Sequence, residues 1–391
     1  MRRLKVKRPA LLSTPSFLIY SIIFLVLLFL LGVIIISSFL HFTLELHSEE
    51  YITPSTLSNT TIVFSPIKLS QGDAFRYIPQ STVHTWTRRK FLIVVSIPSV
   101  DIEIRRKRRH LQRTSCWKYR GVARKENNFN GAMLVVYLIG RHPSHGFNYS
   151  EALANEAAEW HDVITLPINE GIISPNKTVG TQGFCGVEAQ VGVSRKLLIW
   201  FEFTLRFFRK VHFIAKGDDD MFLRVPQFLT DLRTLPRRGL YWGDLCPARL
   251  REGNVTLKYR FALGSLYTLG RDAVKSIISY EPLQRLISQP FRSEREAEYR
   301  AMELHSEDAM VGLILQKSGY YRHVVFVKEM ACSFHDIYSG VRIGPIGRSS
   351  IMIHHLREKD YRELFDLFRN DTGSYRRRKY VNKKNFRLLC K

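Results

Sequence analysis

The chain has 391 residues, of which 45% are apolar and 24% charged, so it belongs with globular proteins and not with disordered ones. Its 59 Lys and Arg residues exceed the 35 Asp and Glu residues, which gives a formal net charge of +24. That excess suits nucleic acid, anionic lipid or a phosphate-bearing ligand as a partner, and charge alone does not choose among them.

The first forty residues have the pattern of a membrane signal anchor. Residues 1–16 form a basic tail, and residues 17–40 form an uncharged apolar run longer than the roughly 20 residues that cross a bilayer as a helix. Basic residues before this run and glutamates after it predict a cytosolic N-terminus and a lumenal remainder. We therefore expect a single-pass type II membrane protein without a nucleic-acid partner, because the later basic runs then face a compartment that lacks nucleic acid.

Two further features suit a lumenal chain. The five cysteines form no CxxC pair or zinc spacing, so they allow at most two disulfides, whose pairing the sequence leaves open. Five Asn-X-Ser/Thr sequons are candidate glycosylation sites, and they begin at Asn59, Asn148, Asn176, Asn254 and Asn370.

Residues 41–90 are rich in Ser, Thr and Pro and lack sustained periodicity, which predicts a lumenal stem. From residue 91 onward, apolar strand-like runs alternate with helical segments. This alternation predicts an α/β domain over 91–370, with a parallel-type sheet covered by helices on both faces, and then a basic, exposed tail over 371–391. We expect strands within 91–97, 132–140, 162–168, 210–217, 238–245 and 323–327, and helices within 105–119, 148–161, 186–208, 226–235 and 305–319.

Three consecutive aspartates, Asp218 to Asp220, follow an apolar strand at the edge where α/β sheets bind ligands. Strand alternation sends Asp218 and Asp220 to one face and Asp219 to the other. Carboxylates suit Mn²⁺ or Mg²⁺, and an ion there would bridge the phosphates of a nucleotide diphosphate and stabilise the charge on this leaving group. Lys216 would offset the repulsion between the carboxylates or contact phosphate. The alternative is a solvated acidic turn.

The sequence around these aspartates, FIAKGDDDMFLR, resembles the K-x-DDD-x-F motif of the β-1,3-galactosyltransferase and β-1,3-N-acetylglucosaminyltransferase superfamily (glycosyltransferase family 31). These are Golgi type II membrane enzymes with a GT-A fold. The resemblance spans about residues 91–368, and the other segments that carry it follow in the family's order: RRHLQRTSCW, EAAEWHDVITL, YRFALGSLYTLGRDAV, SEDAMVGLIL and IMIHHL.

The resemblance implies a GT-A nucleotide-sugar-binding sheet and a set of site residues. Asp220 and His354 would bind Mn²⁺ (or Mg²⁺), with His355 as the neighbouring alternative to His354; neutral imidazole is a suitable ligand for this metal. The resemblance and the charge pattern together assign donor contacts to Asp218, Asp219, Lys216 and Arg113.

Asp308 matches the residue that acts as general base in the family. In such a transfer, one carboxylate takes the proton of the acceptor hydroxyl. Because no second carboxylate acts as a nucleophile, the configuration at the anomeric carbon is inverted. The alternative for Glu307 and Asp308 is a structural role, in which acidic residues in the first turn of a helix complement its dipole.

The chain also departs from the family pattern. It has one residue more before Trp117 than the usual motif, and Lys258 and Phe261 stand where the family has tyrosine. GSLY replaces a glycine-rich segment, and HDIYSG is similar to the kinetoplastid-type branch. These positions leave the transferred sugar and the linkage open.

We therefore expect a Golgi-membrane, metal-dependent, inverting hexosyltransferase with a lumenal catalytic domain. It would transfer galactose or N-acetylglucosamine from UDP-Gal or UDP-GlcNAc to a glycan on glycoprotein, glycolipid or a lipid anchor, most simply in β-1,3 linkage. The alternative is a catalytically inactive lumenal glycan-binding relative. A two-metal phosphodiesterase would need a tighter cluster of His and Asp than the sequence offers.

Overall fold

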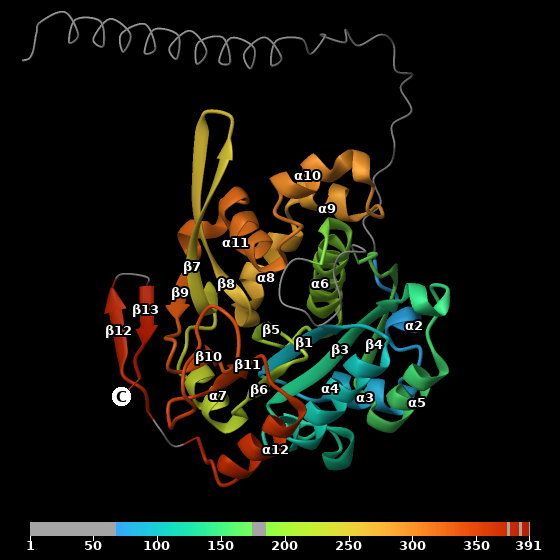
Figure 1. Ribbon diagram of the computed structural model, residues 1–391, viewed down its shortest axis with the longest axis vertical. Coiled ribbons are helices and arrows are strands. Elements are labelled where there is room, and N and C mark those ends of the chain that lie inside the picture. Colours follow the sequence, from blue (N-terminus) through green and yellow to red (C-terminus); the bar gives the residue numbers. More distant parts are fainter. Residues whose placement is uncertain (1–67, 174–184, 374–375, 383–384, 391) are drawn as a thin grey trace, which may run out of the picture. The chain divides into compact units, whose positions relative to one another are not determined.

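The computed structural model describes residues 68–173, 185–373, 376–382 and 385–390 (Figure 1). All of them belong to one structural unit, Phe64–Lys391. The disulfide pairing, which the sequence left open, is settled in part: Cys332 and Cys390 are joined, whereas Cys116 and Cys246 are free thiols.

A ten-stranded mixed sheet forms the centre of this unit, in the order β12-β13-β9-β7-β8-β5-β1-β3-β2, with β4 also paired to β3. β1 is parallel to β3 and β5, whereas β8 is antiparallel to β5 and β7. The prediction of a parallel-type sheet is thus corrected: β7 and β8 are joined by a tight turn at Gly253 (φ 56°), and so short a connection makes them antiparallel. The strands are β1 (Ile93–Ser99), β2 (Val122–Ala123), β3 (Met133–Arg141), β4 (Val163–Asn169), β5 (Phe213–Gly217), β7 (Leu240–Glu252), β8 (Val255–Gly270), β9 (Val325–Lys328), β12 (Lys379–Asn382) and β13 (Asn385–Leu388).

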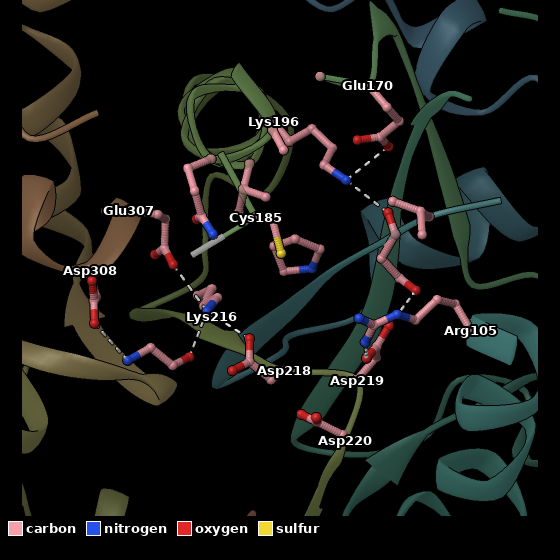
Figure 2. Close-up of a pocket in the computed structure, with 18 of the residues that line it drawn as sticks. Arg105, Glu170, Cys185, Lys196, Lys216, Asp218, Asp219, Asp220, Glu307 and Asp308 are labelled. Atoms are coloured by element: carbon pink, nitrogen blue, oxygen red, sulfur yellow. Dashed lines mark hydrogen bonds and ion pairs between the residues drawn. The ribbon is translucent and has the colours of Figure 1, made fainter. Parts of the chain in front are cut away.

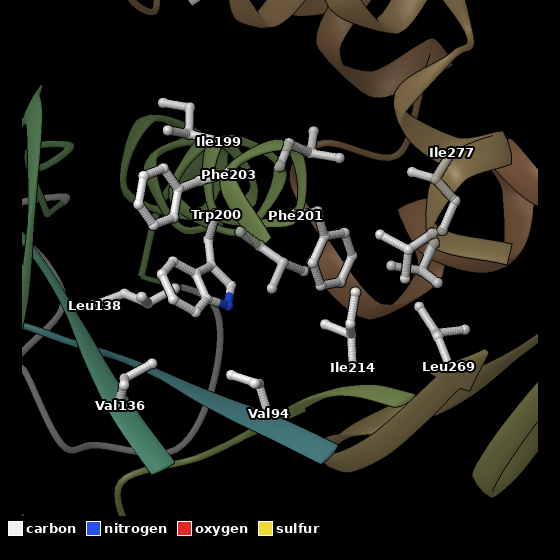
Figure 3. Packing of buried hydrophobic residues seen from close by; sticks show 14 of the residues in the cluster. Val94, Val136, Leu138, Ile199, Trp200, Phe201, Phe203, Ile214, Leu269 and Ile277 are labelled. Carbon is white, nitrogen blue, oxygen red and sulfur yellow. The ribbon is translucent and has the colours of Figure 1, made fainter. Parts of the chain in front are cut away.

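One face of the sheet is covered by α6 (Val187–Phe207), α8 (Arg271–Ile278) and α11 (Glu307–Lys317). Figure 3 shows α6 directing Trp200 and Phe201 onto β1, β3 and β5. Both side chains are fully buried, and each such burial contributes about 1.5–3 kcal/mol. The long apolar helix expected at 186–208 is confirmed.

The other face of the sheet packs against helices and a small second sheet. The small sheet has the order β10-β11-β6, in which β11 is parallel to β10 and antiparallel to β6. The helix expected within 148–161 is α5 (Glu151–Trp160), and the predicted cap is confirmed, since the side chain of Ser150 accepts a hydrogen bond from the amide of Leu153 at 3.1 Å. The elements on this face are α4 (Glu103–Thr114), α5 (Glu151–Trp160), α7 (Val225–Leu232), α12 (Glu358–Leu367), β6 (Met221–Leu223), β10 (Phe334–Asp336) and β11 (Met352–His354).

The fold class, predicted with an N-terminal membrane helix, is corrected to what the described residues show. None of the helices in the described part of the chain combines the length and the apolar character needed to span a bilayer. Residues 1–40, to which the basic tail and the membrane helix were assigned, lie outside the described residues. The fold class is therefore a mixed α/β fold around a central sheet with helices on both faces.

The predicted stem, 41–90, extends too far along the chain, because its last residues belong to the folded unit. Its described part contains two helices, α2 (Gln71–Ala74) and α3 (Gln80–Arg88), both of which pack on the core. Trp86 is 1% exposed, and its ring meets Phe75 and Phe129 at centroid distances of 5.8 and 5.5 Å. The short apolar stripe of α3 gave no sustained periodicity, because the helix is only nine residues long.

The C-terminal segment is likewise not an exposed tail throughout. β13 pairs with β9 and extends the main sheet, and Cys390 is disulfide-bonded to Cys332. Arg377 is buried between Asp231 (2.9 Å) and Glu329 (2.6 Å). The basic composition of the segment suggested exposure, but its carboxylate partners lie far away in the sequence.

Candidate metal and catalytic site

A pocket of about 750 Å³ opens at the carboxyl ends of β1 and β5. Figure 2 shows the three aspartates after β5 at one side, the start of α11 with Glu307 and Asp308 at another, and α6 with Lys196 above them. The carboxyl ends of parallel strands are the ligand-binding edge of α/β sheets. We call this the aspartate pocket.

Asp218, Asp220 and His354 gather on one side of this pocket. The Nε2 atom of His354 lies 2.9 Å from Asp220 Oδ1 and 3.4 Å from Asp218 Oδ2. One ligand atom from each residue lies within 4.8 Å of the others. The antiparallel pairing of β11 with β6, in which His354 is opposite Met221, brings the histidine to the aspartates. Two carboxylates and one imidazole are a suitable donor set for Mn²⁺ or Mg²⁺.

Asp336 fixes the orientation of His354. Its Oδ1 atom lies 3.0 Å from His354 Nδ1 and 3.0 Å from His355 Nδ1. Metal-binding histidines usually donate their second ring N–H to such a carboxylate, which aims the other nitrogen at the metal. Burial lowers the pKa of His354, but its hydrogen bonds to Asp218, Asp220 and Asp336 outweigh burial and raise that pKa well above its usual range.

Asp219 points away from the other two aspartates, as predicted, although the three aspartates lie in the turn between β5 and β6 and not in an extended strand. It is 4% exposed and accepts hydrogen bonds from Ser99 Oγ (2.7 Å) and Arg105 Nη1 (2.5 Å). Arg108 reaches Asp220 Oδ2 at 3.1 Å. Asp219 is therefore held by α4 and by the end of β1. Arg105 and Arg108, which the sequence analysis did not single out, partly neutralise the negative charge of the three aspartates.

Lys216 offsets the repulsion between the carboxylates, one of the two roles considered for it. Its Nζ atom lies 2.8 Å from Asp218 Oδ1 and 3.0 Å from Glu307 Oε2, and it donates to the carbonyl of Gly264 at 2.6 Å. Burial acts against the charge on Lys216, yet these carboxylates raise its pKa. Burial alone would raise the pKa of Asp218, and Lys216 and His354 together hold it below its usual range.

Asp308 lies in the first turn of α11 and lines the aspartate pocket. Its Oδ2 atom accepts a hydrogen bond from the amide of Gly264 at 3.2 Å, and its Oδ1 atom accepts one from Ser306 Oγ at 2.7 Å. The carboxylate is thus held in place while it faces the pocket. Its neighbour Glu307 is buried, and Lys216 and the hydroxyl of Tyr267 occupy its carboxylate.

Arg113, predicted to contact the donor, is not in the aspartate pocket. Its Nε and Nη2 atoms bind Asp162 at 2.8 and 2.7 Å, and its Nη1 atom binds Glu156 at 2.6 Å. Helical spacing explains the difference, because α4 turns Arg105 and Arg108 toward the triplet and Arg113 toward α5 and β4. The i, i+3 spacing of the first two arginines is the sequence signal that would have found them.

Arg113→Leu is expected to lower the free energy of unfolding by about 3–5 kcal/mol, because it leaves the largely buried carboxylate of Asp162 without its ion-pair partner, whereas Glu156 keeps its ion pair with Arg109. Chemical denaturation measures this. Lys107→Met on the same helix removes an exposed ion pair with Glu358 and should change stability by less than about 1 kcal/mol. Equal stability of the two variants would contradict the structural role of Arg113.

Asp336→Asn is expected to weaken Mn²⁺ binding about 10–100-fold, because His354 loses the carboxylate that orients it. Titration calorimetry with Mn²⁺ measures this. Tyr338→Phe, which removes only the hydrogen bond to Asp360, is the control and should bind Mn²⁺ like the parent chain. Unchanged affinity in Asp336→Asn would mean that β11 alone positions the histidine.

Fold and site together define an α/β protein with a candidate divalent-metal site at the carboxyl ends of its central strands. No family model matches the chain, and no curated protein matches it. Among solved structures, a mutant of UDP-glucose pyrophosphorylase from Leishmania major is similar at 8% identity and a TM-score of 0.25. The match covers 55% of this chain and 56% of that one. The function proposed below is argued from the geometry of the site and from the resemblance of the sequence motifs.

Proposed function

We propose that this protein is a metal-dependent, inverting hexosyltransferase that transfers galactose or N-acetylglucosamine from a UDP-sugar to a hydroxyl of a glycan acceptor. One observation carries the proposal: Asp218, Asp220 and His354 come together in a pocket that Asp308 also lines. A metal-binding set for a diphosphate and a separate carboxylate for a proton are the two requirements of such a transfer.

Asp218, Asp220 and His354 would hold Mn²⁺ or Mg²⁺. When bound, the ion supplies positive charge that stabilises the nucleoside diphosphate as it leaves. Lys216 keeps Asp218 ionised, since their charged groups lie 2.8 Å apart. Arg105 and Arg108 add positive charge at the same edge, where a diphosphate would sit.

Asp308 takes the proton in this proposal. The acceptor oxygen forms a bond to the anomeric carbon as the bond from that carbon to the UDP oxygen breaks on the opposite side. The acceptor proton passes to the Asp308 carboxylate, which the Gly264 amide and Ser306 hold in place. No covalent sugar intermediate forms, so the configuration at the anomeric carbon is inverted.

In this proposal, the protein acts in the lumen of the secretory pathway, at the Golgi. Its acceptors are glycans of glycoprotein, glycolipid or a lipid anchor. The Cys332–Cys390 disulfide supports an oxidising compartment. The β-1,3 linkage rests on the resemblance of the motifs alone.

The test is UDP release by the full-length chain with UDP-Gal, UDP-GlcNAc and UDP-Glc in turn, in Mn²⁺ or in EDTA. β-Galactosyl, N-acetylglucosaminyl and mannosyl acceptors are supplied as a mixture. We expect release from one donor, dependent on Mn²⁺ and increased by acceptor. Tight binding of the acceptor glycans without release from any donor would favour the glycan-binding alternative over an enzyme.

A further inference from the structure

A second hollow, of about 680 Å³, lies at the opposite edge of the main sheet. It is formed where the chain enters β5 and β7 and leaves β8, and an adjoining hollow of about 460 Å³ shares two of its residues, His212 and Arg237. The aspartates follow the carboxyl end of β5, whereas His212 precedes its amino end. This basic hollow is therefore separate from the aspartate pocket.

The basic hollow concentrates positive charge. Arg237, Arg238, Arg271 and Lys275 line it, and Lys90 and Lys210 line the adjoining hollow. Within the described residues, none of these six side chains makes an ion pair with a carboxylate. Like charges gathered in one concave surface repel one another, so the arrangement costs stability unless an anion binds there.

The one carboxylate in the basic hollow is already occupied. Asp272 accepts hydrogen bonds from the amides of Gly239 and Ala273 and from the hydroxyl of Tyr320, at 2.7–3.1 Å. These bonds hold the start of α8 against the residue before β7 and the 3-10 helix Tyr320–His323. Asp272 therefore serves the fold, and among the described residues it forms no ion pair with the neighbouring guanidinium groups.

Arg271 is the most constrained of these cations. It is partly buried, and its guanidinium donates only to backbone carbonyls, those of Phe208 (2.9 Å) and Leu205. Burial lowers its pKa, and burial together with Arg237 lowers that of His212. A guanidinium held by carbonyls beside exposed basic side chains is a suitable receptor for phosphate oxygens.

We propose that the basic hollow binds a phosphate-bearing ligand with at least two negative charges, as a second site independent of sugar transfer. Arg237, Arg238 and Lys275 contact the phosphate oxygens from the rim, and Arg271 supplies fixed positive charge at the base. Two sources offer this chemistry, a soluble phosphate compound and the headgroup of a phospholipid.

The experiment compares three full-length chains in EDTA: the parent, the double variant Arg237→Glu/Arg238→Glu, and the control Arg249→Glu/Arg251→Glu. Both double variants change the net charge equally, and all four arginines are exposed. EDTA leaves the three aspartates without a metal, so they disfavour binding of an anion in the aspartate pocket. The probes are inorganic pyrophosphate, by calorimetry, and phosphatidylcholine vesicles with and without phosphatidic acid, by co-sedimentation.

We expect the Arg237→Glu/Arg238→Glu variant to lose at least about tenfold in affinity for one probe, the effect of removing charge-assisted hydrogen bonds, while the control stays within about twofold of the parent. If this variant loses affinity for pyrophosphate, the ligand is a soluble phosphate compound. If it loses only the binding that phosphatidic acid adds to the vesicles, the ligand is a phospholipid headgroup. Equal losses in both double variants, or no loss in either, would overturn the proposal, because net charge and not this hollow would then govern binding. Lys275→Glu alone provides a milder second variant and should reduce the same binding.

Discussion

Asp220→Ala is expected to reduce Mn²⁺-dependent UDP release at least about 10³-fold, because a metal ion stabilises the leaving diphosphate by several kcal/mol. Asp220 Oδ1 lies 2.9 Å from His354 Nε2, and the alanine removes one of the two carboxylates in the donor set. Steady-state UDP release and UDP affinity, each measured in Mn²⁺ and in EDTA, check this. The difference between the two conditions should disappear in the variant.

Asp366→Ala is the matched control for this prediction. It removes an exposed carboxylate of α12 that, within the described part of the chain, forms an ion pair with Arg369 alone, and it should leave UDP release and UDP affinity unchanged. His354→Ala should behave like Asp220→Ala, since it removes a different ligand of the same group. Tight, Mn²⁺-dependent UDP binding in both variants would remove the metal assignment from these residues.

Asp308→Asn is expected to slow sugar transfer by about 10²–10⁴-fold while UDP affinity stays within about threefold of the parent, because the amide keeps the shape of the carboxylate but cannot take the proton. The loss should appear in the single-turnover rate of transfer. In steady-state kinetics, kcat should fall while the KM for the donor stays nearly constant. The hydrogen bond from the Gly264 amide can still reach the asparagine oxygen, so the fold of this turn should persist.

Glu298→Gln is the control for Asp308→Asn. This exposed carboxylate pairs with Arg295 at 2.8 Å and does not line the aspartate pocket, so transfer should be unaffected. If Asp308→Asn retains more than about a tenth of the transfer rate, another group takes the proton. Glu307 is a poor candidate, because Lys216 and Tyr267 occupy its carboxylate.

Local patterns predicted the elements that build the site. The apolar run before the aspartates is β5, the long apolar helix is α6, and the carboxylate-rich helix start is α11. The different orientation of Asp219 was also predicted, but the prediction assumed the alternation of an extended strand, whereas the three aspartates lie in the turn between β5 and β6.

Predictions that depend on contacts between distant segments were less successful. Arg113 pairs with Glu156 and Asp162 because α4 packs against α5 and β4, and nothing local to the motif shows which arginines of the helix face the aspartates. Asp336 acquires its role through the parallel pairing of β10 with β11, which places it opposite His354. The burial of Arg377 likewise follows from a strand that joins the sheet edge late in the chain.

By itself, the sequence determined the α/β character of residues 91–370, the position of the aspartate triplet directly after a strand and the position of the acidic start of α11, because backbone propensity and side-chain periodicity act over a few residues. Only the tertiary structure decided that His354 meets Asp218 and Asp220, that Arg105 and Arg108 neutralise the triplet in place of Arg113, and that cations gather without counter-ions at the opposite sheet edge. Electrostatic contacts act through space between segments more than a hundred residues apart, and strand order and register fix those distances.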